Sequence, residues 1–447
     1  MRLPVWLSGA LLLIISSGVS AIPTAIPTGT TFYDPAKAYN GYILFPGSDN
    51  RTHLIDMTGQ EIRRWDNESF PAWPISVQRA NGRHGHLLAQ LARVNRLDPV
   101  ASPGNGMVNA SVGELDWQGN VTWRYGSQRQ PLHQHHEIQR LANGNTLVMD
   151  AQLRQLPGWG YSIIDNSVDE VTPQGDVVWH WSAAENLDQF GFSDAQLKMI
   201  KDSRDPDFLH LNTAAPLGPN HWYDAGDDRF APGNILINSR NGNVAIIVNK
   251  RTGKAVWRIG PDYPPLQMNT PLPRPLDQTS GAHDVHMIAQ GLPGAGDILI
   301  FDNQGNAGFP PTRQGFFSAS RVIEVNPVSK QIVWEYTAER TGQAISTFYS
   351  AYISNAQRLS NGNTLITEGQ SGRIFQVTPL GDTVWEYVSP YYGKAMPNDK
   401  YVSNTVYRAY LVDYNWAPPG TPHAETPVTA DCRRYPVLPG CPALSGK

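Results

Sequence analysis

Three histidines recur at matching places along the 447-residue chain, and together their side chains could do chemistry. His136, His210 and His283 open consecutive copies of an internal repeat, and Asn212 and Arg240 belong to the same copy as His210. Arginine offers a planar fork that matches a sulfuryl or phosphoryl group and stays charged at any working pH. A neutral histidine can attack such a group, while neighbouring histidines and asparagines stabilise its oxygens or protonate a leaving group. These residue types indicate capture of an oxyanion followed by group transfer.

A repeated pattern of glycines and tryptophans shows which elements must position these side chains. Six times a glycine opens a short apolar run, and each run is followed by a second apolar segment that ends in a tryptophan. The six tryptophans are Trp65, Trp123, Trp179, Trp257, Trp334 and Trp385. A repeat of this size cannot bury both faces of its sheet alone, so the copies must pack on one another.

The third copy shows the expected layout most clearly. Alternating apolar residues and turn sequences predict strands at 136–141, 146–150, 167–172 and 177–181. Six units of four antiparallel strands predict an all-β fold, a six-bladed β-propeller of four-stranded blades. A solenoid and a pair of sandwiches are the alternatives, and neither accounts as well for a four-strand unit repeated six times.

The first copy lacks a strand before Gly41, where its first strand should be. Residues 404–409 look like the first strands of other copies. A C-terminal segment near 404–411 is therefore expected to complete the first blade and to close the ring. These patterns place the propeller domain at residues 22–412.

A propeller would bring the histidines to one place. The first strand of each blade lines the central channel, so residues at one register converge at one rim. The second strand returns antiparallel, which brings Arg240 to the rim beside His210. Ser354 takes the corresponding place in the sixth copy, and His135 alternates away from the channel unless a loop turns it inward. The alternative is a structural role, in which these residues cap blades or bind buried water.

Both ends of the chain predict export. Residues 1–21 have the pattern of a secretory signal peptide and are too short in apolar sequence for a membrane anchor, so we expect a secreted protein without membrane attachment after cleavage. Export permits a disulfide between the only two cysteines, Cys432 and Cys441, in a C-terminal tail at 413–447. Sequons predict glycosylation in a eukaryotic host at Asn67, Asn109 and Asn120. A net charge of −4 without a basic block predicts no nucleic-acid partner.

An ordered set of motifs across residues 40–412 resembles the arylsulfate sulfotransferases, the co-substrate-independent type. The motifs are His135-His-Glu-Ile, Asn143-Gly-Asn-Thr-Leu-Val, His210-Leu-Asn212, Asn238-Ser-Arg240, Thr252-Gly-Lys-Ala-Val-Trp-Arg-Ile-Gly260, His283-Asp284, Phe301-Asp-Asn303 and Arg358-Leu-Ser-Asn-Gly-Asn-Thr-Leu-Ile366. Bacterial members have an additional N-terminal domain. Only about twenty residues separate the predicted cleavage site from the first blade, so we expect a secreted, fungal-type member without that domain.

This resemblance implies a six-bladed propeller that moves a sulfuryl group from a phenolic sulfate to a phenol by a ping-pong mechanism. By motif, His283 would be the nucleophile and would carry the sulfuryl group between the two half-reactions. The residues that would hold this group and handle the phenolic proton are His136, His210, Asn212 and Arg240. Further candidates for substrate binding are His135, Ser354 and Asn303. The resemblance implies small phenolic substrates, no nucleotide sulfate donor and no required cofactor.

Three other functions fit parts of the sequence. A metal-dependent enzyme could use the ring of histidines as ligands, although no close set of two histidines and one carboxylate is evident, and metal analysis would decide. The turn at Thr252–Trp257 occurs in propellers of quinone-dependent dehydrogenases, but it is structurally generic. The propeller could also have been recruited to another small-molecule transformation, or to a binding role without catalysis.

Overall fold

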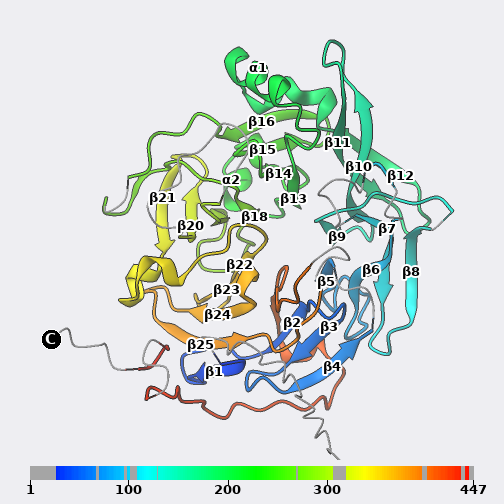
Figure 1. The fold of residues 1–447 in the computed structure, drawn as a ribbon. Helices are drawn as coiled ribbons and strands as arrows, with labels where there is room; N and C mark the ends of the chain where they lie inside the picture. The colour runs from blue at the N-terminus through cyan, green and yellow to red at the C-terminus, as the bar shows by residue number, and fades with distance from the viewer. Residues whose placement is uncertain are drawn as a thin grey trace, which may run out of the picture.

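The computed structural model describes residues 27–66, 70–94, 98–100, 108–127, 129–267, 270–305, 319–394, 400–433 and 438–441. Within these ranges, six antiparallel sheets stand around a central axis as the blades of a propeller (Figure 1). The first strand of each blade lies nearest the axis, and the later strands follow outward. The predicted all-β, six-bladed propeller of four-stranded antiparallel blades is therefore confirmed.

Blades 1 to 3 each contain four strands, which follow one another from the axis outward. Blade 1 contains β26 (Tyr410–Val412), β2 (Tyr42–Pro46), β3 (Thr52–Ile55) and β4 (Glu61–Trp65). Blade 2 contains β5 (Ala72–Pro74), β6 (Leu87–Arg93), β7 (Asn109–Leu115) and β8 (Val121–Gly126). Blade 3 contains β9 (Ile138–Arg140), β10 (Thr146–Gln155), β11 (Ser162–Val171) and β12 (Val177–Ser182).

The other three blades follow the same order. Blade 4 contains β13 (Leu211–Pro216), β14 (Ile235–Ser239), β15 (Val244–Asn249) and β16 (Lys254–Ile259). Blade 5 contains β18 (His283–Met287), β19 (Ile298–Asp302), β20 (Arg321–Asn326), β21 (Gln331–Tyr336) and an outer fifth strand β17 (Arg274–Pro275). Blade 6 contains β22 (Asn355–Arg358), β23 (Thr364–Glu368), β24 (Arg373–Val377), β25 (Thr383–Val388) and an outer fifth strand β1 (Gly29–Tyr33).

In the described structure, helices lie in the connections between strands, except for one 3₁₀ helix that follows the last strand. The α-helices are α1 (Asp194–Ser203) and α2 (His221–Asp224). The 3₁₀ helices are η1 (Ala184–Phe190), η2 (Asp228–Phe230), η3 (Ala338–Thr341), η4 (Ile345–Thr347), η5 (Gly369–Ser371) and η6 (Tyr414–Trp416). Among the described residues, no helix has the length and apolar character needed to cross a bilayer.

The six repeated tryptophans join each blade to the next. The indole N–H of Trp65 in blade 1 donates to the carbonyl of Asp116 in blade 2 (2.9 Å), and Trp385 in blade 6 donates to Met57 in blade 1 (2.7 Å). The other four make the equivalent bond, from Trp123 to Pro173, from Trp179 to Lys250, from Trp257 to Pro327 and from Trp334 to Pro379. Each bond reaches the turn between the two outer strands of the following blade. The repeat therefore encodes the contact between blades as well as the blade itself.

The C-terminal segment closes the first blade, as the sequence predicts. Strand β26 pairs antiparallel with β2, with Tyr410 opposite Leu44. Pairing begins later than predicted, because the residues before β26 bond to blade 6 instead. The backbone N–H of Ser354 donates to the carbonyl of Tyr407 (3.0 Å), and that of Val406 donates to Gly369 (2.9 Å).

The fifth strands of blades 5 and 6 are not evident in the sequence. Strand β1 pairs with the outer edge of β25, so the segment before the first repeat extends the last blade. The backbone N–H of Tyr33 then donates to the carbonyl of Val428 in the C-terminal tail (2.8 Å). Strand β1 covers the outer edge of β25, and the two-residue β17 covers the outer edge of β21. Neither strand starts a blade, and neither carries the glycine and tryptophan pattern of the repeat.

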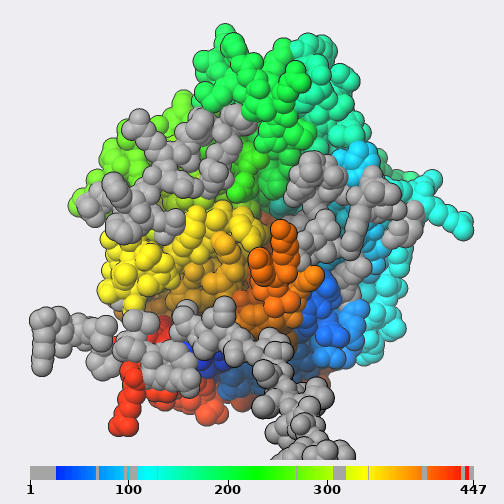
Figure 2. All heavy atoms as spheres, in the orientation of Figure 1, coloured from blue at the N-terminus to red at the C-terminus, as the bar shows by residue number. Residues whose placement is uncertain are grey.

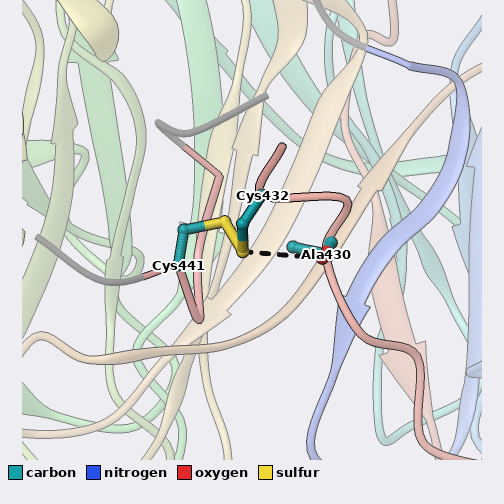
Figure 3. Close-up of a disulfide and its surroundings, with 3 residues drawn as sticks. All are labelled: Ala430, Cys432 and Cys441. Carbon is teal, nitrogen blue, oxygen red and sulfur yellow. Dashed lines mark hydrogen bonds between the residues drawn. A yellow bond between two sulfur atoms is a disulfide. The ribbon is translucent and has the colours of Figure 1, made fainter. Parts of the chain in front are cut away.

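The C-terminal tail contains the predicted disulfide, and the predicted glycosylation sites differ in their exposure. The predicted disulfide joins Cys432 to Cys441, with Cα atoms 5.3 Å apart (Figure 3). Asn109 is wrong as a glycosylation site, because it is buried in β7 and its Nδ2 donates to Phe70 and Gln134. Asn120 is exposed in the turn between β7 and β8 and stays a prediction. The predicted signal peptide at 1–21 and the sequon at Asn67 lie outside the described residues.

Candidate functional site

The rim of the central channel is built from strained backbone. Four residues of the rim have positive φ angles, a backbone region that residues other than glycine rarely adopt. They are His136 (52°), His210 (45°), Asp284 (52°) and Ser354 (88°). Each residue lies at or near the start of the innermost strand of blades 3 to 6. Such strain persists only where surrounding structure holds it, and it concentrates at functional sites. It also explains why β9 begins at Ile138 rather than at the predicted residue 136.

The structure brings His136 and His210 into direct contact. Their ring centroids are 4.8 Å apart, with the ring planes at 82°. His135 also belongs to this cluster. Its Nδ1 lies 2.8 Å from Nδ1 of His136, so one imidazole donates a hydrogen bond to the other. Nε2 of His135 is buried and has no protein partner. The turn at His136 thus lets both neighbouring histidines belong to one cluster.

His283 is held by hydrogen bonds at both ring nitrogens. Its Nδ1 lies 2.8 Å from Oδ1 of Asn303 and 2.9 Å from the carbonyl of Gly281. Both partners are acceptors, so Nδ1 carries the proton and Nε2 carries the lone pair. The backbone N–H of Ile353 donates to Nε2 (3.1 Å). Asn303 also donates to the carbonyl of Ile353 (3.0 Å) and to that of Ser350 (2.7 Å), and therefore orients the ring from behind.

Burial sets the charge state of these imidazoles. It lowers the pKa of His283 well below its usual value, and the positive charge of Arg240 lowers this pKa further. Burial, followed by the neighbouring His210, also holds the pKa of His136 well below its usual value. The pKa of His135 falls to about 4, again mainly because of burial. These three rings are neutral at neutral pH, which is the form of imidazole that can act as a nucleophile.

Arg240 follows β14 and reaches the same rim. Its backbone N–H donates to the carbonyl of His210 (3.1 Å), and its Nη1 donates to Oδ1 of Asn241 (2.7 Å). Burial lowers the pKa of the Arg240 guanidinium, but an arginine remains charged in proteins. After burial, the positive charge of Arg240 is the next cause of the lowered pKa of His283.

Asn212 and Ser354 have structural hydrogen bonds. Nδ2 of Asn212 donates to the carbonyl of Ala282 (2.9 Å), and its Oδ1 accepts from Asn238 (2.9 Å), so its amide ties blade 4 to blade 5. Oγ of Ser354 accepts from the backbone N–H of Gly369 (3.0 Å) within blade 6. These contacts make Asn212 and Ser354 parts of the frame around the histidines.

A buried arginine at the centre of the ring was not predicted from the sequence. Arg408 is 1% exposed and comes from the segment before β26, which lies near the middle of the face in orange (Figures 1 and 2). Its Nη1 lies 2.8 Å from Oε2 of Glu137 and 3.4 Å from Oδ1 of Asp284, and Nη2 donates to the carbonyl of Asn212 (2.9 Å). One side chain thus links blades 3, 4 and 5 to the closing segment. The likeness of 404–409 to the first strands was the signal that could have placed it on the axis.

Glu137 is the carboxylate most affected by this central position. Burial raises its pKa to about 7, although the neighbouring Arg408 opposes the shift. Oε1 of Glu137 and Nε of Arg408 are buried without a protein partner. This buried charge cluster adjoins the histidines, because Glu137 and Asp284 directly follow His136 and His283 in the sequence.

Aromatic side chains adjoin the histidines on one side. The rings of Phe70 and Tyr407 meet edge to face with centroids 3.8 Å apart, and each centroid lies 6.1 Å from that of His136. Ile353 packs with both rings. The backbone N–H bound to His283 therefore belongs to a residue whose side chain is part of this apolar wall.

A metal centre finds no support in the side-chain arrangement. In the described part of the chain, no group of three or more histidine, cysteine, aspartate or glutamate side chains is placed to hold a metal ion. The site offers neutral imidazoles, a guanidinium and aromatic rings.

A comparison with protein-family models names a family for this chain. Residues 104–378 match the family model described as arylsulfotransferase (ASST). A solved structure of a protein of unknown function from Bacteroides caccae is 12% identical, with a TM-score of 0.47, and the match covers 83% of this chain and 98% of that chain. The periplasmic gluconolactonase of Pseudomonas aeruginosa is also 12% identical, with a TM-score of 0.38 and coverage of 82% and 100%. A search among curated proteins gave no match. Because the family model spans more than half of the sequence and includes the histidines, Arg240 and Asn303, the chain belongs to the arylsulfotransferase (ASST) family.

Proposed function

We propose that the protein transfers a sulfuryl group from a phenolic sulfate to a phenolic acceptor by a ping-pong mechanism through His283. The observation that carries this proposal is the state of His283, a neutral imidazole whose Nδ1 proton is fixed by Asn303 and Gly281 and whose Nε2 holds a lone pair. The family supports a transferase in general. The positions of the side chains support a role for each of them in the individual steps of the transfer.

In the first half-reaction, Nε2 of His283 attacks the sulfur of the aryl sulfate. The N–S bond forms as the S–O bond to the aromatic ring breaks, and the phenolate oxygen leaves with the bonding pair and takes a proton. Attack requires Nε2 to give up the hydrogen bond from Ile353. The released backbone N–H can then donate to a sulfuryl oxygen, and Arg240 offsets the negative charge of the group.

The second half-reaction reverses these steps with a different phenol. The acceptor oxygen attacks the sulfur, the N–S bond breaks, and its electron pair returns to Nε2 of His283. The phenolic proton passes to a base in the site. Asn303 keeps the ring orientation through both halves, because its amide binds Nδ1 rather than the reacting nitrogen.

The wall formed by Phe70, Tyr407 and Ile353 supports an aromatic substrate. Aromatic rings pair favourably edge to face, and such pairs contribute about 0.5–1.5 kcal/mol beyond the area they bury. A phenolic ring against this wall would lie next to His136 and within the cluster. We infer that small phenols bind here, and that no nucleotide sulfate donor or other cofactor is needed. We also propose that the protein acts outside the cell after cleavage of the signal peptide. The disulfide supports this location, because disulfides persist in oxidising environments.

The proposal is tested with para-nitrophenyl sulfate as donor, with and without phenol as acceptor. We expect release of para-nitrophenol that increases with phenol concentration, together with formation of phenyl sulfate. The reaction should proceed unchanged in the presence of a chelator. Release that requires an added metal would favour the metal-dependent alternative, and an absence of phenyl sulfate would overturn the proposal.

Replacement of Arg240 by alanine should lower kcat/KM for the donor by about a hundredfold, because the charge that offsets the developing negative charge is lost. The exposed Arg251 in the turn after β15 provides the matched control, since Arg251→Ala removes the same charge from the same blade. Steady-state rates with para-nitrophenyl sulfate measure both variants. An equal decrease of kcat/KM in the two variants would show that Arg240 has no specific role in the transfer step.

A further inference from the structure

We propose that Asp207 forms a proton-transfer pair with His210. The family resemblance already places His210 among the residues that handle the phenolic proton, and Asp207 is the new member of the site. His210 would give a proton to the leaving phenolate and take one from the acceptor phenol. Asp207 would be a positioning residue that acts through His210. This inference rests on the proposed function and assigns the proton that the reaction must move.

The contact between the two side chains is short and directional. Oδ2 of Asp207 lies 2.5 Å from Nδ1 of His210. A carboxylate at this distance makes Nδ1 the donor, and the lone pair of the neutral ring is then at Nε2. When Nε2 takes a proton, the carboxylate stabilises the resulting imidazolium, as in catalytic triads on other folds.

The loop that carries Asp207 is fixed by hydrogen bonds on both sides. Its backbone N–H donates to Oδ1 of Asp205 (2.9 Å), and its carbonyl accepts from Nδ2 of Asn241 (2.9 Å). The carbonyl of His210 accepts from the backbone N–H of Arg240 (3.1 Å). The pair is therefore anchored to the same short segment that carries Arg240.

The other histidines of the cluster lack this arrangement. His135 and His136 face each other through their Nδ1 atoms, and His283 bonds to an amide and to backbone groups. Among these four rings in the described structure, His210 is the one with a carboxylate at hydrogen-bonding distance. The groups around it that carry or can take a charge are Asp207, Arg240, His135, His136 and His283. His210 is also partly exposed, with 22% of its side chain accessible, so a proton can reach it from solvent between turnovers.

One residue, His210, can both give and take the proton that the two half-reactions require. In the first, His210 starts protonated at Nε2 and gives this proton to the phenolate oxygen as the S–O bond breaks and the N–S bond to His283 forms. His210 is then neutral. In the second, it takes the proton from the acceptor phenol as the acceptor oxygen bonds to sulfur and the N–S bond breaks. The pair returns to its starting state.

The test compares two donors in Asp207→Asn. The para-nitrophenolate ion leaves readily without a proton, whereas unsubstituted phenolate needs one. We expect kcat/KM to fall by about 10² to 10³-fold for phenyl sulfate, within the range of general acid catalysis, and by less than about tenfold for para-nitrophenyl sulfate. Asp202→Asn makes the same substitution at an exposed position on α1, where Asp202 pairs with Lys198, and should change neither value.

Two further results separate this role from a structural one. His210→Ala should show the same dependence on the leaving group, and the double variant should lose no more activity than His210→Ala alone. An equal decrease of kcat/KM for the two donors in Asp207→Asn would overturn the proposal. Additive decreases in the double variant would overturn it as well. If the wild-type protein transfers no sulfuryl group at all, the proposed function fails instead.

Discussion

Replacing His283 by alanine should abolish sulfuryl transfer and leave a folded propeller. The substitution removes the atom that forms the N–S bond, so both half-reactions lose their covalent intermediate. We expect kcat/KM to fall by at least about a thousandfold, as is typical when a nucleophile is removed. The ring is 1% exposed, and its loss leaves Asn303 and the backbone N–H of Ile353 without this partner. A destabilisation of about 1–3 kcal/mol should accompany the change.

The matched control for His283 is a histidine outside the site. His180 lies on β12, the outer strand of blade 3, where its side chain is 45% exposed and pairs with Asp169. His180→Ala should retain wild-type transfer. Circular dichroism and the midpoint of thermal unfolding show whether each variant is folded. A folded His283→Ala protein that keeps activity within tenfold of wild type would show that another residue carries the sulfuryl group.

Replacing Arg408 by alanine should be among the most destabilising single changes in the protein. Arg408 is fully enclosed and pairs with Glu137 and Asp284, so its removal leaves the buried Glu137 without this counter-ion and leaves Asp284 paired with His286 alone among its described ion pairs. Breaking a buried ion pair from one side costs about 3–5 kcal/mol. The same side chain links the closing segment to three blades, so the loss should appear as a lower free energy of unfolding in urea. The activity should fall as well, because Glu137 and Asp284 directly follow His136 and His283 in the sequence.

The effect of Arg408→Ala should depend on pH in a defined direction. The pKa of Glu137 is raised to about 7 by burial, whereas the unfolded chain has the usual lower value, so the folded state takes up a proton first as pH falls. Protonation of Glu137 removes the unpaired charge, and the variant should therefore be less destabilised at pH 5 than at pH 8. Glu137→Gln in the Arg408→Ala background should recover part of the lost stability at pH 8. A double variant no more stable than Arg408→Ala would contradict this assignment.

The architecture could be predicted from the sequence because the repeat is local. Each copy contains its own strands and turns, and the tryptophan that ends it donates to the next copy at every one of the six junctions. The missing first strand of the first copy was enough to predict closure by the C-terminal segment. The place of the histidines followed from the same register, since the first strands converge on one axis.

The parts that escaped prediction depend on contacts between distant segments. Arg408 meets Glu137 across 271 residues of sequence, and no periodicity marks such a pair. The bond from Ile353 to His283 depends on the strained backbone at 353 and 354. The role of Asn212 in the site stays a prediction, and its hydrogen bonds to Ala282 and Asn238 could not be read from the sequence. The burial of Asn109 could not be read either, because a sequon carries no information on burial.

The covalent intermediate can be trapped, which tests the claim that His283 carries the sulfuryl group. The protein is mixed with para-nitrophenyl sulfate without an acceptor, quenched with base, and examined by intact mass and peptide mapping. We expect one added sulfuryl group on the peptide that contains His283, and its disappearance when phenol is added before the quench. A protein that releases para-nitrophenol but carries the group on another residue, or carries an adduct that phenol does not discharge, would contradict the claim.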